Sequence, residues 1–187
     1  QLRQYSLVEV PDGTTLTFAV KPVDATDGRP AGEVSRWIAD HIRVGDLVDV
    51  TIPFGDLPAP SGRDPLLLIS AGIGVTPMVG ILAHLAAEAP HTVVQALHAD
   101  RSERAHPLRE RQSQLVAALP NAGLHTWYED GRGLLTLDGI DIPAGVQVYL
   151  CGNSGFVQAV RAQLVARGVA MSQVHCELFA PNDWLLG

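Results

Sequence analysis

The sequence lacks any apolar run that approaches the roughly 20 residues a membrane-spanning helix needs. Its longest apolar stretches, residues 66–69 and 78–87, have the lengths of a strand and a short helix and flank a glycine-rich turn. It also lacks an excess of positive charge, because 13 Lys and Arg stand against 20 Asp and Glu, a formal net charge of -7. Nucleic acids and anionic membranes repel such a chain, so neither is expected as a partner.

Cysteine is scarce in this sequence. Only Cys151 and Cys176 occur, without the spacing of metal ligands, and the seven histidines are scattered with no zinc-type pairing. We therefore expect no metal site and two free thiols, as in a protein of the reducing cytoplasm. With 187 residues, 47% of them hydrophobic, the chain can bury a core without disulfides, in one large domain or two small ones.

The first 57 residues predict short antiparallel strands. Apolar and polar residues alternate in three segments, residues 4–10, 15–23 and 47–57. A Pro-Asp-Gly turn between the first two segments indicates a hairpin, and Ser35 is expected to cap a short helix that ends near Gly45. Three strands and one helix are too few to close a barrel. Residues 58–65, rich in Pro, Gly and Ser, then predict a linker.

From residue 66 the pattern changes to apolar strands that alternate with amphipathic helices. Strands are predicted at residues 66–70, 92–98, 124–128, 146–151 and 173–179. Helices are predicted at residues 76–89, 107–119 and 155–168. Strands that are apolar throughout indicate a parallel sheet with helices on both faces. Residues 66–187 should thus form a doubly wound α/β domain, a fold that binds ligands beyond the carboxyl ends of its strands.

Two glycine-bearing turns join strands to helices at that edge. The first is Gly72-Ile73-Gly74-Val75-Thr76-Pro77, whose glycines would let the backbone approach a phosphate, with Thr76 as the N-cap of the next helix and Pro77 in its first position. It lacks the third glycine of the Rossmann fingerprint, so these residues alone allow either nucleotide binding or a structural turn. The second turn, at Cys151-Gly152, places a thiol at the same edge, unless Cys151 is simply a small buried hydrophobic residue.

Further polar candidates lie at the ends of strands. Arg101, Ser102 and Arg104 follow the second strand of the sheet, where the ribose of a dinucleotide or its 2′-phosphate would lie. No acidic residue is clearly placed to accept a hydrogen bond from the ribose 2′-hydroxyl. Exposed loop arginines also serve solubility, and Glu177 on the last strand fits a solvated face equally well. These residues therefore allow a binding role and a surface role.

The order of the motifs is more informative than any one of them. R-x-Y-S, G-x-V-S before a short helix, P-F-G-D, G-I-G-V-T-P-M, Y-L-C-G and a closing E-L-F-x-P follow one another along the chain. In this order the sequence resembles the ferredoxin reductase-like flavoenzymes over essentially its whole length. Within them it is most similar to the reductase half of flavohaemoglobins, on the wording R-Q-Y-S-L, L-I-S-A-G-I-G-V-T-P-M, H-T-W-Y at residues 125–128 and E-L-F-A-P.

The resemblance implies an α/β plus β architecture in two domains. Residues 1–57 would be the C-terminal part of an antiparallel FAD-binding β-barrel whose first strands are missing, with exposed strand edges, and residues 66–187 the NAD(P)-binding domain. Contacts to FAD are implied for Arg3, Gln4, Tyr5, Ser6, Gly32, Val34, Ser35, Leu178, Phe179, Ala180 and Pro181. Contacts to NADH or NADPH are implied for Gly72, Ile73, Gly74, Val75, Thr76, Cys151 and Gly152.

Three of the residues matched by the resemblance would act directly on the reaction. Ser6 would lie near flavin N5, Cys151 beside the nicotinamide ring, and Glu177 on the electron path towards a haem. Two positions depart from the family pattern. Asn153 stands where proline is usual, which would loosen the start of the helix or cap it differently, and Ala180 stands where glycine is usual, which would crowd a flavin contact.

The function implied is electron transfer from NADH or NADPH through FAD to haem, as the reductase part of a nitric oxide dioxygenase. The haem would belong to a globin domain, upstream in the same chain or in a separate partner. One alternative is a reductase component of an oxygenase, or a stand-alone flavin or ferredoxin reductase. Another is a non-catalytic nucleotide-binding remnant. The resemblance favours NADH, whereas Arg101 and Arg104 could accept the 2′-phosphate of NADPH.

Overall fold

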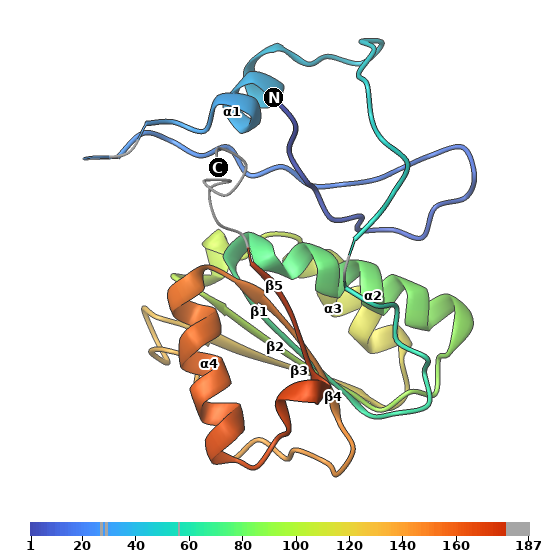
Figure 1. The fold of residues 1–187 in the computed structure, drawn as a ribbon, viewed down its shortest axis with the longest axis vertical. Helices are drawn as coiled ribbons and strands as arrows, with labels where there is room; N and C mark the ends of the chain where they lie inside the picture. The colour runs from blue at the N-terminus through green and yellow to red at the C-terminus, as the bar shows by residue number, and fades with distance from the viewer. Residues whose placement is uncertain (27, 29, 56, 179–187) are drawn as a thin grey trace.

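The computed structural model describes residues 1–26, 28, 30–55 and 57–178. The strands predicted for the second half form one five-stranded sheet in the order β3-β2-β1-β4-β5, and every neighbouring pair is parallel (Figure 1). The strands are β1 (Leu66–Ala71), β2 (Val94–Asp100), β3 (Ala122–Tyr128), β4 (Gln147–Gly152) and β5 (Val174–Leu178). Successive strands are added in one direction from β1 to β3 and in the other direction from β4 to β5, so the switch point of the sheet lies between β1 and β4. These are the two strands that the glycine turns follow.

Helices cover both faces of this sheet, as the sequence predicts. In Figure 1, α2 (Val75–Glu88) and α3 (Arg109–Ala118) lie on one face, and α4 (Ser154–Ala166) lies on the other. Short 3-10 turns at Gly72–Gly74, Glu103–Ala105 and Met171–Gln173 complete the connections.

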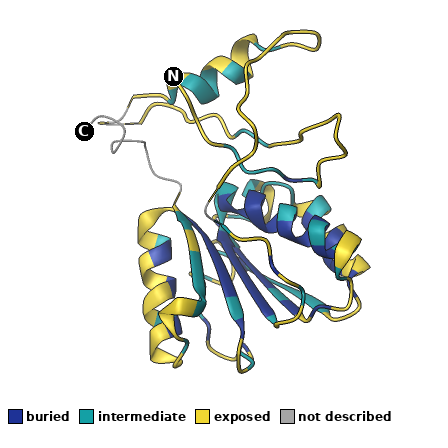
Figure 2. Ribbon diagram, turned by 45° about the vertical axis from the view of Figure 1, so that its right-hand side comes forward, coloured by how far each residue is buried: buried dark blue, intermediate teal, exposed yellow. Residues whose placement is uncertain are grey.

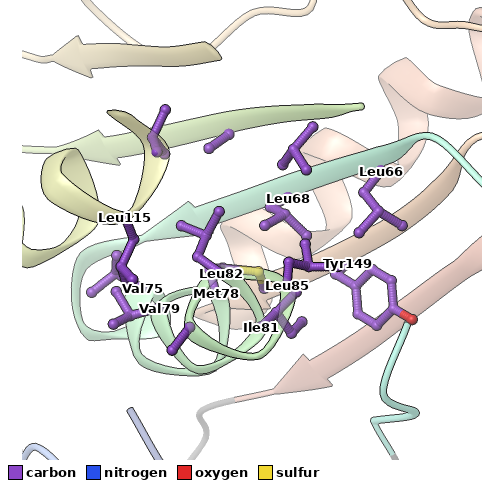
Figure 3. Close-up of a cluster of buried hydrophobic side chains, with 14 of the residues drawn as sticks. Leu66, Leu68, Val75, Met78, Val79, Ile81, Leu82, Leu85, Leu115 and Tyr149 are labelled. Atoms are coloured by element: carbon purple, nitrogen blue, oxygen red, sulfur yellow. The ribbon is translucent and has the colours of Figure 1, made fainter. Parts of the chain in front are cut away.

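The core has two layers because successive side chains of a strand point to opposite faces. Leu66 and Leu68 pack with the apolar residues of α2 and α3, as Figure 3 shows. Leu67 and Ile69 pack with those of α4 on the other side. The central strands β1, β2 and β4 are therefore buried along most of their length and the edge strands β3 and β5 are mostly half-buried, in contrast to the largely exposed chain before residue 58 (Figure 2).

The strands predicted within residues 1–57 do not form, and that prediction was wrong. Among the described residues of this segment, one isolated antiparallel bridge joins Leu7 to Phe18, beside a hydrogen bond from the Val8 N–H to the Thr17 carbonyl. The described residues of this segment close no barrel. A strand needs partners for its backbone groups and a layer that covers its apolar side. Among the described residues, no such layer covers the apolar side chains of residues 44–54, several of which are almost fully exposed, namely Val44, Leu47 and Ile52.

The short helix α1 (Glu33–His41) forms, but with other ends than predicted. Gly32 is its N-cap, and the chain turns extended at Ile42, before Gly45. Ser35 lies inside the first turn, where its hydroxyl donates to the Gly32 carbonyl and accepts from the Val23 N–H, both at 3.2 Å. A β-carbon on Gly32 would lie 2.6 Å from this hydroxyl oxygen, so the turn requires glycine.

Candidate functional site

A cavity of about 740 Å³ lies at the carboxyl edge of the sheet, between the turn after β1 and the turn after β4. Its volume is in the range of sites for small molecules and cofactors. Four predicted contact residues line it, Gly72, Ile73, Gly74 and Gly152. The wall also includes Lys21, Asp100, Arg101, Glu129, Asn153 and Phe156. The cavity thus lies at the switch point where doubly wound sheets bind ligands.

Glycine is needed on both sides of this cavity. A β-carbon on Gly74 would lie 2.5 Å from the carbonyl oxygen of Cys151, and one on Gly152 would lie 2.7 Å from the Phe156 ring. Gly72 has a φ of +52°, a left-handed conformation that side chains disfavour. The two turns therefore pack backbone against backbone, which leaves the edge of the sheet open to a ligand.

The predicted cap of α2 was wrong. The 3-10 turn Gly72–Gly74 leads directly into the helix, so the N-cap is Gly74, and Pro77 is the third helical residue instead of the first. The Thr76 hydroxyl donates to the Ile73 carbonyl at 3.0 Å. Val75 and Thr76 are buried beneath the turn and do not line the cavity, so the structure does not bring these two predicted contacts to it.

The start of α4 confirms one of the two expectations for Asn153. Its side-chain oxygen accepts from the Phe156 N–H at 2.9 Å, so it caps the helix in the manner typical of asparagine. The N-terminus of α4 is therefore capped without the proline that is usual in the family.

Cys151 lies in the core beneath the cavity instead of lining it. Its side chain is fully buried, and burial, with the Glu177 carboxylate and Cys176 adding to it, raises the pKa of the thiol well above its usual range. The thiol therefore stays protonated at neutral pH. The part of Cys151 that borders the turns is its backbone carbonyl, next to Gly74.

Two residues implied for the reaction meet from opposite ends of the chain. The Ser6 hydroxyl donates to Glu177 Oε2 at 3.5 Å, and Glu177 lies beside Cys151 in the pairing of β5 with β4. Burial raises the pKa of the Glu177 carboxyl, although the bond from Ser6 opposes this shift. Tyr5 stacks on Phe18 with ring centroids 5.6 Å apart.

The residues implied for the FAD diphosphate are brought near one another by Gln1. Its side-chain oxygen accepts from the Arg3 guanidinium, and its side-chain nitrogen donates to Glu33 Oε2, both at 2.5 Å. Glu33 is the first residue of α1, next to Gly32. Arg3 and Gln4 are exposed, Val34 and Ser35 are half-buried in the first turn of the helix, and Leu178 ends β5 exposed. Phe179, Ala180 and Pro181 lie outside the described residues.

Sequence reasoning missed Asp100, an acidic residue in the wall of the cavity. Burial alone would raise the pKa of its carboxyl, but the neighbouring His98 imidazole and the Arg101 N–H outweigh burial and hold the pKa below its usual value. Asp100 was passed over because the strand was predicted to end at His98, whereas β2 continues to Asp100. Asp100 is therefore the last residue of β2 and lies at the carboxyl edge of the sheet.

Of the three polar residues predicted after β2, only Arg101 lines this cavity. Ser102 accepts from the Ala105 N–H at 3.3 Å and caps a 3-10 turn. Arg104 lines a separate surface groove together with Glu103 and Arg109.

Within the described residues, no group of three or more His, Cys, Asp or Glu side chains is placed to hold a metal ion. The same part of the chain contains no helix of the length and apolarity needed to cross a membrane.

A doubly wound parallel sheet with a glycine-lined cavity at its switch point defines a nucleotide-binding α/β domain. The family model of the oxidoreductase NAD-binding domain matches residues 68–162. The chain belongs to this family of oxidoreductase NAD-binding domains.

Known proteins resemble the chain beyond this domain. The flavohemoprotein of Chromobacterium violaceum is 36% identical over 98% of the chain, which covers 50% of that protein. The solved FAD/NAD-binding domain of nitric oxide dioxygenase from Vibrio cholerae superposes with a TM-score of 0.88 at 34% identity, over 97% of this chain and 78% of that one. The flavohemoglobin of Malassezia yamatoensis, solved with bound FAD and heme, superposes with a TM-score of 0.82 at 31% identity. This match covers 96% of this chain and 47% of that one. The chain thus spans about half the length of the flavohemoprotein it matches.

Proposed function

We propose that this chain is the reductase part of a flavohaemoglobin-type nitric oxide dioxygenase. It would bind NAD(P)H and FAD and pass electrons to the haem of a globin domain. The observation that carries this proposal is the glycine-lined cavity between β1 and β4, on a chain similar throughout to proteins named for FAD, NAD and haem.

The cavity fits a dinucleotide in size and in chemistry. Its floor is backbone at Gly74 and Gly152, where a side chain would collide with neighbouring atoms. Lys21 and Arg101 add positive charge to the wall, which suits a diphosphate. The residues of this chain that would hold the nicotinamide dinucleotide are therefore the two glycine turns and these two cations.

The flavin would lie against the N-terminal segment and β5. Ser6 and Glu177 are in contact there, and Tyr5, the residue before Ser6, supplies an aromatic ring that stacks on Phe18. We assign residues 1–57 to an FAD-binding barrel, residues 58–65 to a linker and residues 66–187 to the NAD(P)-binding domain. The exposed apolar side chains of residues 44–54 support this division, because other strands of a barrel would cover them.

The contribution of the protein to the reaction is positioning. When bound, the nicotinamide supplies a hydride and the flavin accepts it and releases electrons singly. The chain's own residues would hold the two ring systems in register and keep water from the contact between them. The protonated Cys151 thiol fits this role, because it adds no charge beneath the site.

The experiment that tests the proposal uses the full-length natural polypeptide. We expect it to purify with bound FAD, to lose its yellow colour when NADH is added without oxygen, and then to reduce a bound haem and consume nitric oxide. Ser6→Ala should slow flavin reduction while FAD stays bound, and Ser61→Ala, at an exposed linker position, should not. A protein that retains no flavin would refute the proposal. Flavin reduction without haem reduction would instead support a reductase with another acceptor.

A further inference from the structure

The cavity at the carboxyl edge of the sheet has an arm that runs along α4. Four residues at helical spacing line this arm from α4, namely Phe156, Ala159, Val160 and Gln163. Three residues of the chain between β3 and β4 also line it, namely Gly133, Leu134 and Leu135. We call these three residues the loop wall. Gln163 is the one polar side chain among the residues of the arm.

The loop wall belongs to no strand or helix, so its backbone groups need partners from elsewhere. Before the wall, the Tyr128 carbonyl accepts from three successive N–H groups, those of residues 131–133, at 2.7 to 3.2 Å. Leu134 lies beyond this turn and is 78% exposed, so packing alone does not hold it. The position of Leu134 therefore depends on the bonds that hold the chain after it.

Gln163 holds that part of the chain with both ends of its side-chain amide. Its Oε1 accepts from the Leu137 N–H at 2.8 Å, and its Nε2 donates to the Leu135 carbonyl in a longer bond of 3.4 Å. A reversed amide would place donor against donor and acceptor against acceptor, so these two partners fix its orientation. Gln163 thus lines the cavity and also ties the end of the loop wall to α4.

Arg167 holds the same segment one turn further along α4, outside the cavity. Its guanidinium donates to the carbonyls of Leu137 and Ile140, at 2.7 and 2.9 Å. Arg167 is not one of the described residues that line the cavity. The two side chains therefore have separable effects, because Arg167 fastens the loop behind the cavity and Gln163 fastens a residue of its wall.

We propose that Gln163 is a positioning residue for the dinucleotide, which holds Leu134 and Leu135 where the bound ligand needs them. This inference rests on the proposed function, because it concerns the same cavity. A loop that is held before binding loses less conformational freedom when the ligand arrives, so the tether raises affinity. The loop wall follows β3, at the opposite edge of the sheet from Glu177 on β5. The tether therefore acts on the adenosine diphosphate part of the ligand and not on hydride transfer.

The test uses the full-length protein and measures binding in two ways. ADP-ribose, which is the dinucleotide without its nicotinamide ring, gives a Kd that does not depend on turnover. Stopped-flow reduction of the flavin by NADH gives a half-saturating concentration and a limiting rate. Gln163→Met keeps the length of the side chain and removes the amide. We expect it to raise the Kd and the half-saturating concentration roughly 3- to 10-fold, the range of one hydrogen bond, and to leave the limiting rate unchanged within about twofold.

Arg167→Met is the matched control, because it removes two bonds to the same segment outside the cavity. We expect it to change the Kd for ADP-ribose less than about twofold. Hydrogen exchange at the Leu137 amide reports the tether directly. It should become faster in Gln163→Met and slow again when ADP-ribose is added. If Gln163→Met does not fold, Gln163→Glu replaces it, because a carboxylate has no donor for the Leu135 carbonyl and should also weaken binding.

The outcomes separate this inference from simpler ones. Faster exchange at Leu137 with unchanged affinity would overturn it, because Gln163 would then be structural only. Weaker binding with unchanged exchange would overturn it in favour of a direct contact with the ligand. Equal losses of affinity in Gln163→Met and Arg167→Met would overturn it in favour of a general loosening of the loop. Failure of flavin reduction with the expected ADP-ribose affinities would refute the proposed function and leave this inference standing, whereas no binding of ADP-ribose would refute both.

Discussion

His106 is the residue whose surroundings most clearly fix its charge. Its ring nitrogens meet the Tyr128 hydroxyl at 3.1 Å and the Gln112 side-chain oxygen at 2.9 Å, and it stacks on His98. Burial, and then the charge that His98 would carry if protonated, lower the pKa of His106 to about 4. Asp100 opposes this shift and Arg109 adds to it. The imidazole is therefore neutral in the folded protein at physiological pH.

This lowered pKa predicts how stability depends on pH. Between pH 6.5 and about 4 the unfolded chain binds a proton that folded His106 does not. The contribution of neutral His106 to the free energy of unfolding is complete above pH 6.5. It falls by up to about 1.4 kcal/mol per pH unit as the pH drops towards 4. Burial also lowers the pKa of His98, which acts in the same direction. Urea unfolding at pH 7.5, 6 and 5 should show the loss. His106→Gln should reduce the slope, while His91→Gln, at an exposed residue, should leave it unchanged.

Gly74 offers a second prediction for a single residue. Alanine there would place a β-carbon 2.5 Å from the backbone of Cys151, and a backbone cannot rotate away as a side chain can. We expect Gly74→Ala to destabilise the protein by about 1–3 kcal/mol, the usual cost of overpacking, and to weaken dinucleotide binding. Gly131→Ala meets no atom within 4 Å and is the matched control. Equal unfolding midpoints for the two variants would show that the turns are not in tight contact.

The candidate site could be predicted in part. Gly72, Gly74 and Gly152 could be found because glycine between a strand and a helix is a local signal, and the structure brings all three to the cavity. Thr76 was wrongly predicted as the N-cap because the 3-10 turn moves the start of the helix two residues earlier. No residue in the turn indicates this shift from the sequence. Asp100 was missed because the end of a strand depends on its neighbours, and β3 pairs with β2 as far as Asp100.

At the scale of elements, α4 depends on a single side-chain cap. The Asn153 oxygen satisfies the Phe156 N–H, one of the backbone donors that a helix leaves unpaired at its start. We expect Asn153→Ala to lower the free energy of unfolding by about 1 kcal/mol. Asn153→Asp keeps the acceptor and places negative charge at the N-terminus of the helix, so it should retain or raise stability. Equal loss in both variants would show that the cap is not the cause.

The strands and helices from residue 66 onwards were predictable from the residue pattern of each segment alone. All five strands and three helices from residue 66 onwards lie within about two residues of their predicted bounds, because burial on both faces produces long apolar strands whatever the details. Residues 1–57 show the same alternation as other antiparallel sheets, yet the one pairing between two described residues of this segment is the isolated bridge from Leu7 to Phe18. The alternation indicates which side of a strand is apolar. A sheet forms only when a partner strand pairs with that segment and another layer covers its apolar side.

At the scale of the whole molecule, the N-terminal segment is attached to α2 and α3. Val8 is buried in the core beside α2. Glu9 accepts two bonds from the Arg111 guanidinium of α3, at 2.6 and 2.8 Å. Gly80 of α2 lies against the Leu7 backbone, with no room for a side chain between them. Because Ser6 adjoins these anchors, they set its distance to Glu177 on β5, and the flavin contacts depend on them.

Gly80→Ala is expected to loosen this attachment without unfolding the sheet. The new β-carbon would collide with the Leu7 carbonyl oxygen, so the helix and the N-terminal segment would have to separate. In the full-length protein, we expect weaker FAD retention and faster proteolysis within residues 1–57, while binding of ADP-ribose changes less than threefold, because its cavity lies at the ends of the strands. Glu9→Gln should have the same effects in a milder form, since a half-exposed ion pair contributes about 0.2–1 kcal/mol. Unchanged FAD retention in Gly80→Ala would show that the flavin contacts do not rest on the packing of Leu7 against α2.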